Sequence, residues 1–154
     1  MGRQVFESSQ WVRSPRARVF DFFADAANLQ AITPAFLDFR ILTPLPVTMR
    51  AGAVIAYRLK LHGLPVHWRT VIDAWEPGVR FVDRQERGPY AHWVHTHAFE
   101  DERGGTRLTD RVEYALPLDP LSRPVLALYV RPSVERIFAH RRAVIAERFG
   151  GEGG

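Results

Sequence analysis

The feature that most constrains the fold is a series of short segments in which apolar and polar side chains alternate, separated by turn residues. Within residues 106–116, Leu108 and Tyr114 face one way while Arg111 faces the other, a period of two that is typical of a strand with one buried face. Because tight turns join antiparallel neighbours, we expect a meander. The predicted strands cover residues 4–12, 37–42, 53–61, 66–75, 79–87, 90–100 and 106–116.

The apolar spacing changes to three and four residues after Ser122, which predicts a long C-terminal helix. Pro132 interrupts this segment, so we expect the helix to kink or split there, because proline removes one backbone hydrogen bond. Two short helices are predicted after the first strand, one beginning at Pro15 with Ser14 as its cap and one over residues 25–31. Only the C-terminal helix is long enough to cover the sheet, so the sequence predicts an α+β fold. The buried stripe of that helix is expected to contain Val134, Ile137, Phe138, Arg141, Ile145 and Phe149.

The length of 154 residues and the apolar content of 46% suit one domain with its own core. We expect this domain to span residues 1–149, and the glycine-rich residues 150–154 to form a flexible tail. No apolar run approaches the roughly 20 residues that cross a bilayer. The N-terminus also lacks the layout of a signal peptide, so we expect a cytoplasmic protein without integral membrane association.

Several chemistries are excluded or disfavoured by composition and missing motifs. The absence of cysteine excludes disulfides, thiolate metal sites and cysteine nucleophiles. The net charge is +4, but the arginines are scattered and often alternate with acids, so no nucleic-acid partner is expected. The sequence has no G-x-S-x-G motif, no phosphate-binding glycine loop and no dinucleotide fingerprint, so no cofactor is predicted.

A set of motifs spread over the chain resembles one known superfamily. The motifs are SPRARVFDFF at 14–23, NLQAITP at 28–34, GPYAHWVHTHAF at 88–99, GTRLTDRVEY at 105–114 and the pair Phe138-x-x-Arg141. Together they resemble the SRPBCC superfamily, which includes START lipid-transfer domains, plant pollen-allergen-like proteins and polyketide cyclase/dehydratases, and within it an uncharacterised bacterial ligand-binding subgroup.

The resemblance covers about residues 3–149 and implies a helix-grip fold. In that fold, a curved antiparallel sheet of about six to seven strands wraps around the long C-terminal helix, with a ligand cavity between them. It implies no particular activity, since such a fold carries binding, transport and catalysis alike.

The inner face implied by the alternation is mostly apolar, as expected of a pocket for a small hydrophobic ligand. Four ionisable residues share this face, namely Asp83, His95, His97 and Asp110, and their burial requires partners. The predicted ligand-binding residues are Tyr57, Trp68, Thr70, Phe81, Gln85, Trp93, Phe99, Val112, Tyr114, Phe138 and Arg141.

His95 and His97 are compatible with two kinds of chemistry. Side chains two apart on a strand point the same way, about 6 to 7 Å apart, so two imidazoles are able to bind one metal ion. The resemblance does not imply a metal, and none is predicted. A histidine facing Asp83 or Asp110 instead has the parts for proton transfer near neutral pH.

These four residues are therefore candidate catalytic residues for cyclisation or dehydration of a polyketide-like substrate. The alternative is a hydrogen-bonded network that only fixes the shape of the pocket. Arg141 also has two interpretations. It either reaches into the cavity towards Asp83, Asp110 or an acidic ligand group, or forms an internal salt bridge that holds the helix on the sheet.

Three functions follow from these observations, and binding of a small hydrophobic ligand, or its transport, is our main prediction. The ligand would be a lipid, a polyketide or another aromatic compound. The second is a cyclase/dehydratase enzyme, and the third is an interaction domain that docks through the outer sheet face. That outer face is expected to carry Arg58, Lys60, Arg69, Arg107 and Arg111.

Overall fold

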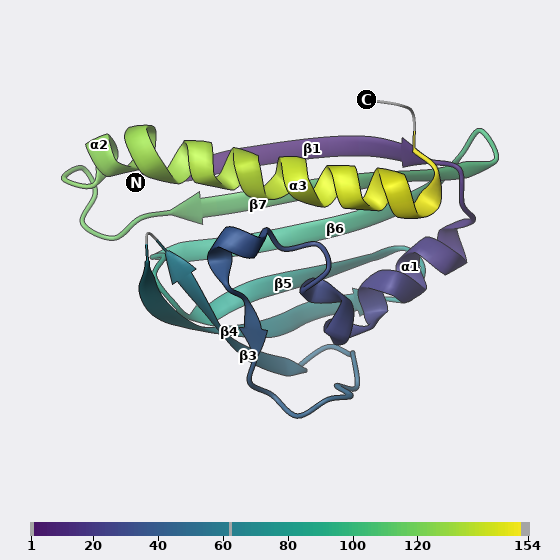
Figure 1. Cartoon of the computed structure of the whole chain (residues 1–154), viewed down its shortest axis with the longest axis horizontal. Helices are drawn as coiled ribbons and strands as arrows, with labels where there is room; N and C mark the ends of the chain where they lie inside the picture. The colour runs from purple at the N-terminus through teal and green to yellow at the C-terminus, as the bar shows by residue number, and fades with distance from the viewer. Residues whose placement is uncertain (1, 62, 152–154) are drawn as a thin grey trace.

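The computed structural model describes residues 2–61 and 63–151, and within them one seven-stranded antiparallel sheet (Figure 1). The strand order is β1-β7-β6-β5-β4-β3-β2, so the first and last strands of the chain lie side by side. All other neighbouring strands in the sheet are consecutive in the chain, which confirms the predicted meander. The strands are β1 (Gln4–Val12), β2 (Arg40–Ile41), β3 (Val54–Leu61), β4 (Leu64–Glu76), β5 (Arg80–Arg87), β6 (His92–Glu102) and β7 (Gly105–Ala115).

The helices lie in front of the sheet in Figure 1. Helix α3 runs along β1 and β7, and α1 lies at the right of the view, near the C-terminal end of α3. This arrangement confirms the α+β class and the helix-grip architecture. The helical elements are α1 (Arg16–Ala24), η1 (Ala26–Leu29), η2 (Ala35–Leu37), α2 (Arg123–Val125), η3 (Leu126–Val130) and α3 (Arg131–Phe149).

The C-terminal helix is continuous from α2 through η3 to α3, although Pro132 predicted a kink or a split. The segment η3 is π-helical, and the backbone N–H of Arg131 donates to the carbonyl oxygen of Leu126. A π-turn is wider than an α-turn and inserts one extra residue. Pro132 is the second residue of α3 and comes just after this π-turn. Of the two predicted outcomes the split is therefore wrong, since the chain stays helical on both sides of Pro132 and a π-turn precedes it.

Helix α1 begins at Arg16, and Ser14 does not cap it as predicted. The hydroxyl of Ser14 instead donates to the carbonyl oxygen of Phe149 (3.0 Å), the last residue of α3. The carbonyl of Ser14 accepts from Oγ1 of Thr106 on β7 (2.8 Å). Ser14 thus joins the end of α3 to the sheet.

The chain between α1 and β3 is less regular than predicted. In place of the second helix there is the 3₁₀ turn η1. The side chain of Asp25 caps this turn by accepting a hydrogen bond from the N–H of Ala27 (3.0 Å). The predicted strand over residues 37–42 is reduced to β2, because η2 precedes it and Asp38 adopts a left-handed conformation (φ 44°). These turns lie over the sheet rather than extending it.

The alternation of inward and outward side chains changes phase within β4. The register against β5 shifts between Ile72 and Ala74, and beyond this bulge Ala74 pairs with Val82 and Trp75 with Phe81. Trp75 and Phe81 pack together with ring centroids 5.2 Å apart, so Trp75 faces the core. Strict alternation over the predicted strand 66–75 would turn Ala74 inward with Trp68 and Thr70, and this is wrong, because one extra residue in a strand reverses the phase beyond it.

Residues 150–151 were predicted to belong to a flexible tail, but both are paired. Gly150 takes the left-handed conformation that commonly ends a helix (φ 75°), and its carbonyl accepts from the N–H of Arg13 (3.0 Å). Gly151 pairs with Val12. Residues 152–154, the rest of the predicted tail, lie outside the described residues.

One end of the space between helices and sheet is packed solid by aromatic rings. Phe20 of α1 contacts Phe99 edge-on (5.1 Å between centroids) and Phe81 (6.0 Å). Phe22 packs in the same manner against Phe149 of α3 (5.5 Å). Edge-to-face contacts of this kind add about 0.5–1.5 kcal/mol to the burial itself. This core anchors α1 and the end of α3.

The outer face of the sheet carries the five basic residues assigned to it. Lys60, Arg69, Arg107 and Arg111 each form an ion pair with a carboxylate, at N–O distances from 2.6 to 4.0 Å. Exposed pairs of this kind are a normal feature of a solvated surface. Docking through this face stays a prediction.

Candidate ligand pocket

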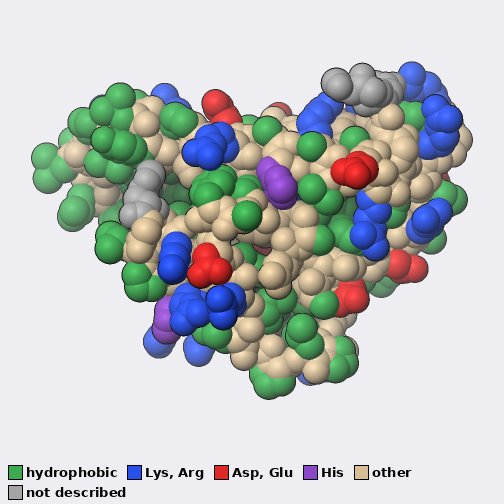
Figure 2. All heavy atoms as spheres, in the orientation of Figure 1, with side chains coloured by type: hydrophobic (Ala, Val, Ile, Leu, Met, Phe, Trp, Pro, Cys, Tyr) green, Lys and Arg blue, Asp and Glu red, His purple; other side chains and the backbone are tan. Residues whose placement is uncertain are grey.

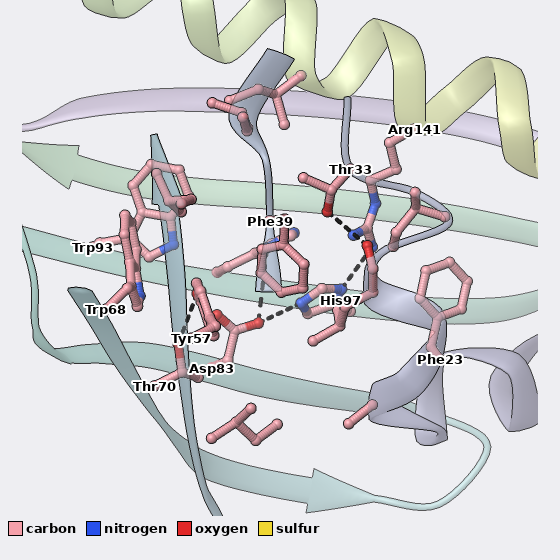
Figure 3. A pocket seen from close by; sticks show the side chains of 18 of the residues that line it. Phe23, Thr33, Phe39, Tyr57, Trp68, Thr70, Asp83, Trp93, His97 and Arg141 are labelled. Carbon is pink, nitrogen blue, oxygen red and sulfur yellow. Dashed lines mark hydrogen bonds and ion pairs between the residues drawn. The ribbon is translucent and has the colours of Figure 1, made fainter. Parts of the chain in front are cut away.

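A pocket of about 190 Å³ lies between the sheet, the η1–η2 segment and α3 (Figure 3). It is larger than the cavity of about 150 Å³ that is known to hold a benzene molecule. Its walls are rich in aromatic rings. Trp68 meets Trp93 edge-on (5.3 Å, 89°), and Tyr57 stacks on Trp68 (5.9 Å, 16°). The pocket therefore suits a compact molecule of one or two rings.

Most of the residues predicted to form the ligand site and the catalytic site line this pocket. They come from four adjacent strands and from α3, which confirms the alternation on which the prediction depended. Those that line it are Tyr57, Trp68, Thr70, Phe81, Asp83, Trp93, His95, His97, Phe138 and Arg141.

Five predicted residues lie outside the pocket. The side chain of Gln85 bonds to the main chain of Tyr90 instead, at 2.8 and 3.0 Å. Phe99 belongs to the aromatic core under α1. Val112 and Tyr114 lie on β7 beneath α3 and pack in its apolar contact with the sheet. Asp110, also on β7, lies behind the two histidines.

The wall formed by the chain between α1 and β3 was missed by the sequence analysis. Ala26, Ile32, Leu37 and Phe39 line the pocket, next to Phe23 of α1. Their apolar character was visible in the sequence, but this segment has no regular period that would show which side chains point inward.

Four ionisable residues meet at one end of the pocket because of their register in the sheet. Asp83 lies opposite His95 on β5 and β6, and His97 lies opposite Asp110 on β6 and β7. All four occupy inward positions of the period-two pattern. Arg141 reaches them from α3, above the sheet (Figure 3). The constellation predicted from the sequence is thus brought together in space.

The rings of His95 and His97 are stacked at 3.6 Å, and Phe81 stacks on the other side of His97 at 3.9 Å. Nε2 of His95 lies 2.8 Å from Oδ1 of Asp110. Nε2 of His97 lies 2.6 Å from Oδ2 of Asp83. Each histidine therefore has a carboxylate of its own.

Arg141 determines which nitrogen of His97 carries the proton. Its Nη2 lies 3.0 Å from Nδ1 of His97 and 3.2 Å from Oδ1 of Asp110. Guanidinium groups only donate hydrogen bonds, so Nδ1 of His97 must be the acceptor. The proton of the neutral ring is then on Nε2, which donates to Asp83. Arg141 thus performs both suggested roles, since it pairs with Asp110 of the sheet and also lines the pocket.

The pKa values of the two carboxyl groups are shifted in opposite directions. Burial raises the pKa of Asp83 above its ordinary value, and the nearby His95 and Arg141 offset this only in part. Burial acts on Asp110 too, but there Arg141 and the hydrogen bond from His95 outweigh it and hold the pKa well below its ordinary value. Burial, assisted by His95 and Arg141, lowers the pKa of His97. Asp110 is therefore the carboxylate, whereas Asp83 keeps its proton to a higher pH.

Three polar atoms of pocket-lining residues have no partner within the described part of the chain. They are Nε1 of Trp68, Nε of Arg141 and Oδ1 of Asp83. The first two are buried donors, and buried donors in proteins are nearly always satisfied by protein, water or a ligand. Near them the hydroxyl of Tyr57 bonds to Oγ1 of Thr70 (3.1 Å). The pocket is apolar in its walls but offers hydrogen bonds at its end.

The trio of Asp83, His95 and His97 places three potential metal-ligand atoms within 4.8 Å of one another. Its surroundings do not suit a divalent cation. If Nε2 of His97 bound a metal while Nδ1 accepted from Arg141, the ring would have to lose both protons. The positive charge of Arg141 also opposes a second cation at this distance. The protonation pattern thus favours a proton-bearing site over a metal centre.

Comparison with known proteins agrees with this architecture. A family model described as polyketide cyclase/dehydrase and lipid transport matches residues 12–138, most of the chain. The chain belongs to this family. The match confirms the resemblance to the SRPBCC superfamily, and a small hydrophobic ligand is what the family supports. No curated protein matches the sequence.

Solved structures share the fold at low sequence identity. A nucleoside-diphosphate sugar epimerase from Corynebacterium glutamicum matches with a TM-score of 0.71 and 24% identity, over 92% of this chain but only 28% of that one. The chain thus spans about a quarter of that larger protein. The Zhui aromatase/cyclase from a Streptomyces species matches with a TM-score of 0.71 and 18% identity, over 95% of this chain and 93% of that one. Ginseng major latex-like protein 151 from Panax ginseng matches with a TM-score of 0.67 and 12% identity, over 96% of this chain and 98% of that one.

Proposed function

We propose that the protein binds a compact aromatic molecule that carries a hydrogen-bond acceptor at one end. The observation that carries the proposal is the pocket, in which the aromatic walls of Trp68 and Trp93 lead to Asp83, His95 and Arg141. The ring system would lie against Trp68 and Trp93. Its carbonyl or hydroxyl oxygen would accept a hydrogen bond at the polar end.

The cavity volume limits the ligand to a small one. About 190 Å³ suits one or two rings and is too small for a long acyl chain held entirely inside. The family to which the chain belongs, and an aromatase/cyclase with the same fold, support a hydrophobic or polyketide-like ligand. Binding of this kind would serve transport or storage of the ligand without further chemistry.

Calorimetric titration with two bicyclic probes tests the proposal. The probe α-tetralone carries a ketone, and tetralin has a similar shape without any acceptor. We expect α-tetralone to bind about tenfold more tightly, because only its oxygen accepts a hydrogen bond from protonated Asp83. Native mass spectrometry of protein purified from its own cells would then identify the natural ligand.

A matched pair of variants shows whether binding occurs in the pocket. Ala26 is buried and lines it, whereas Ala27 is exposed on the same turn. Ala26→Phe should fill the cavity and abolish binding, and Ala27→Phe should bind as the wild type does. Equal binding by both variants, or no binding of either probe to the wild type, would refute the proposal.

A second candidate function, acid–base catalysis, is favoured by one specific observation. Nδ1 of His95 lies 3.8 Å from Oδ2 of Asp83, too far for a hydrogen bond, and both residues line the pocket. A neutral Asp83 would protonate a ligand carbonyl while Nδ1 of His95 removes a proton from the adjacent carbon. Such enolisation is one of the steps that cyclisation and dehydration require.

Exchange of deuterium from D₂O into the carbon next to the ketone of α-tetralone, followed by NMR, tests this second function. The wild type should accelerate the exchange, and both Asp83→Asn and His95→Gln should lose the acceleration. His97→Gln should lose less, since His97 contributes only through Asp83. If the wild type binds the probe without accelerating exchange, the enzyme function is refuted while the binding function stands.

A further inference from the structure

We propose that the end of the molecule formed by α2, η3 and the loop before them docks on an anionic lipid surface. Exposed apolar side chains gather there, at the upper left of Figure 2 and over the α2 end of the C-terminal helix in Figure 1. We call this patch the apolar tip and define it by its four most informative residues, whose exposed fractions are 76%, 81%, 49% and 68%. They are Leu118, Leu121, Val125 and Leu128.

The apolar tip is not explained by packing within the chain. Leu126 of the same helical segment is buried against the sheet, so one side of the segment already has its contact. Leu121, Val125 and Leu128 leave the other side apolar as well. A surface helix normally turns a polar face to water, and one that is apolar all round is usually covered. Large exposed patches of this kind mark interaction sites.

The character of the exposed face changes abruptly where α3 begins. From Arg131 onward, the outward positions carry charges, and most of them are positive. Over residues 123–149 the exposed charged residues are five arginines and two glutamates. Within the described residues, Arg131, Arg136, Arg142 and Arg148 form no ion pair with a carboxylate.

This combination of an apolar end and unneutralised arginines fits a lipid surface. Leucine and valine side chains insert at the boundary between headgroups and acyl chains, while arginines on the same helix attract anionic headgroups. The charge therefore favours an anionic membrane over a second copy of the chain, whose tip would bring the same positive charges together. The proposal does not depend on the identity of the pocket ligand.

The tip and part of the pocket wall lie on the same C-terminal helix. Ser133 and Ile137 line the pocket from α3, one to three turns after Leu128. A molecule that partitions into the bilayer would therefore meet the protein close to its binding site.

Co-sedimentation with vesicles tests the proposal. The wild type should bind vesicles of phosphatidylcholine and phosphatidylglycerol and should bind phosphatidylcholine alone much more weakly. Added salt should weaken the binding, because the arginine contribution is screened. Leu121→Asp/Leu128→Asp should reduce binding by about tenfold or more, and Arg131→Gln/Arg136→Gln should remove the preference for anionic vesicles.

Val79→Asp is the matched control, since Val79 is 45% exposed in the turn before β5, away from the tip. It should bind vesicles like the wild type, and circular dichroism should show all variants folded. Absence of vesicle binding by the wild type would overturn the proposal. Vesicle binding by the Leu121→Asp/Leu128→Asp variant that equals wild-type binding would also overturn it. A third contrary result would be a wild-type protein that forms a dimer and does not bind vesicles, together with a monomeric Leu121→Asp/Leu128→Asp variant.

Discussion

Replacement of Arg141 by methionine should destabilise the protein strongly. Arg141 is buried and donates to Asp110 and to His97, at 3.2 and 3.0 Å. Methionine fills a similar volume but leaves the buried carboxylate of Asp110 with only the hydrogen bond from His95. Removal of one partner of a buried ion pair costs about 3–5 kcal/mol. For a chain of this length we expect the melting temperature to fall by roughly 6–20 °C.

A double-mutant cycle separates the charge from the packing. Asp110→Asn alone leaves Arg141 buried without its carboxylate, whereas Arg141→Met/Asp110→Asn removes both charges together. The double variant should therefore lose less stability than the sum of the two single variants, by about 2 kcal/mol or more. Urea unfolding of all four proteins at neutral pH gives the required free energies of unfolding.

The pH dependence of the same variants gives a second check. In the wild type, the depressed pKa of Asp110 means that its contribution is present above about pH 4, the ordinary value, and is lost as the pH falls towards the folded value. Without Arg141, burial dominates and the pKa of Asp110 rises. The deficit of Arg141→Met should then shrink on acidification. The reasoning would be refuted if Arg141→Met lowered the free energy of unfolding by less than about 1 kcal/mol at neutral pH. It would also be refuted if the effects of Arg141→Met and Asp110→Asn were additive in the double variant.

Three further predictions concern other parts of the structure. Binding of α-tetralone should weaken as the pH rises through the raised pKa of Asp83, because the ionised carboxyl group no longer donates a hydrogen bond to the ketone oxygen. Calorimetry of Asp83→Asn should show no such pH dependence. Gly105→Ala should destabilise by more than about 2 kcal/mol in urea unfolding, since a Cβ there would collide with the carbonyl oxygen of Val12; a change near zero would contradict this. Ser14→Ala should cost about 1 kcal/mol through loss of its bond to Phe149, and a thermal shift below 1 °C would argue against that bond.

The strand pattern determined much of the candidate site in advance. Inward positions on β5, β6 and β7 follow directly from a period of two, so the sequence alone predicts that Asp83, the two histidines and Asp110 share one face. The same rule failed at Ala74, where a bulge reverses the phase without a turn residue to announce it.

Other features depend on contacts between distant segments. The proton position on His97 follows from Arg141, which lies 44 residues away on another element. The wall formed by Ile32 and Phe39 depends on how irregular turns fold over the sheet. Ser14 had the expected position for a cap but bonds to the end of the chain's last helix instead. Local patterns do not encode such long-range partners, and this is why the sequence analysis missed them.

A crystal structure of the complex with α-tetralone tests the central claim most directly. The account predicts its rings against Trp68 and Trp93, with the ketone oxygen within hydrogen-bond distance of Asp83. The probe bound elsewhere on the surface, or a pocket closed by the surrounding side chains, would contradict it.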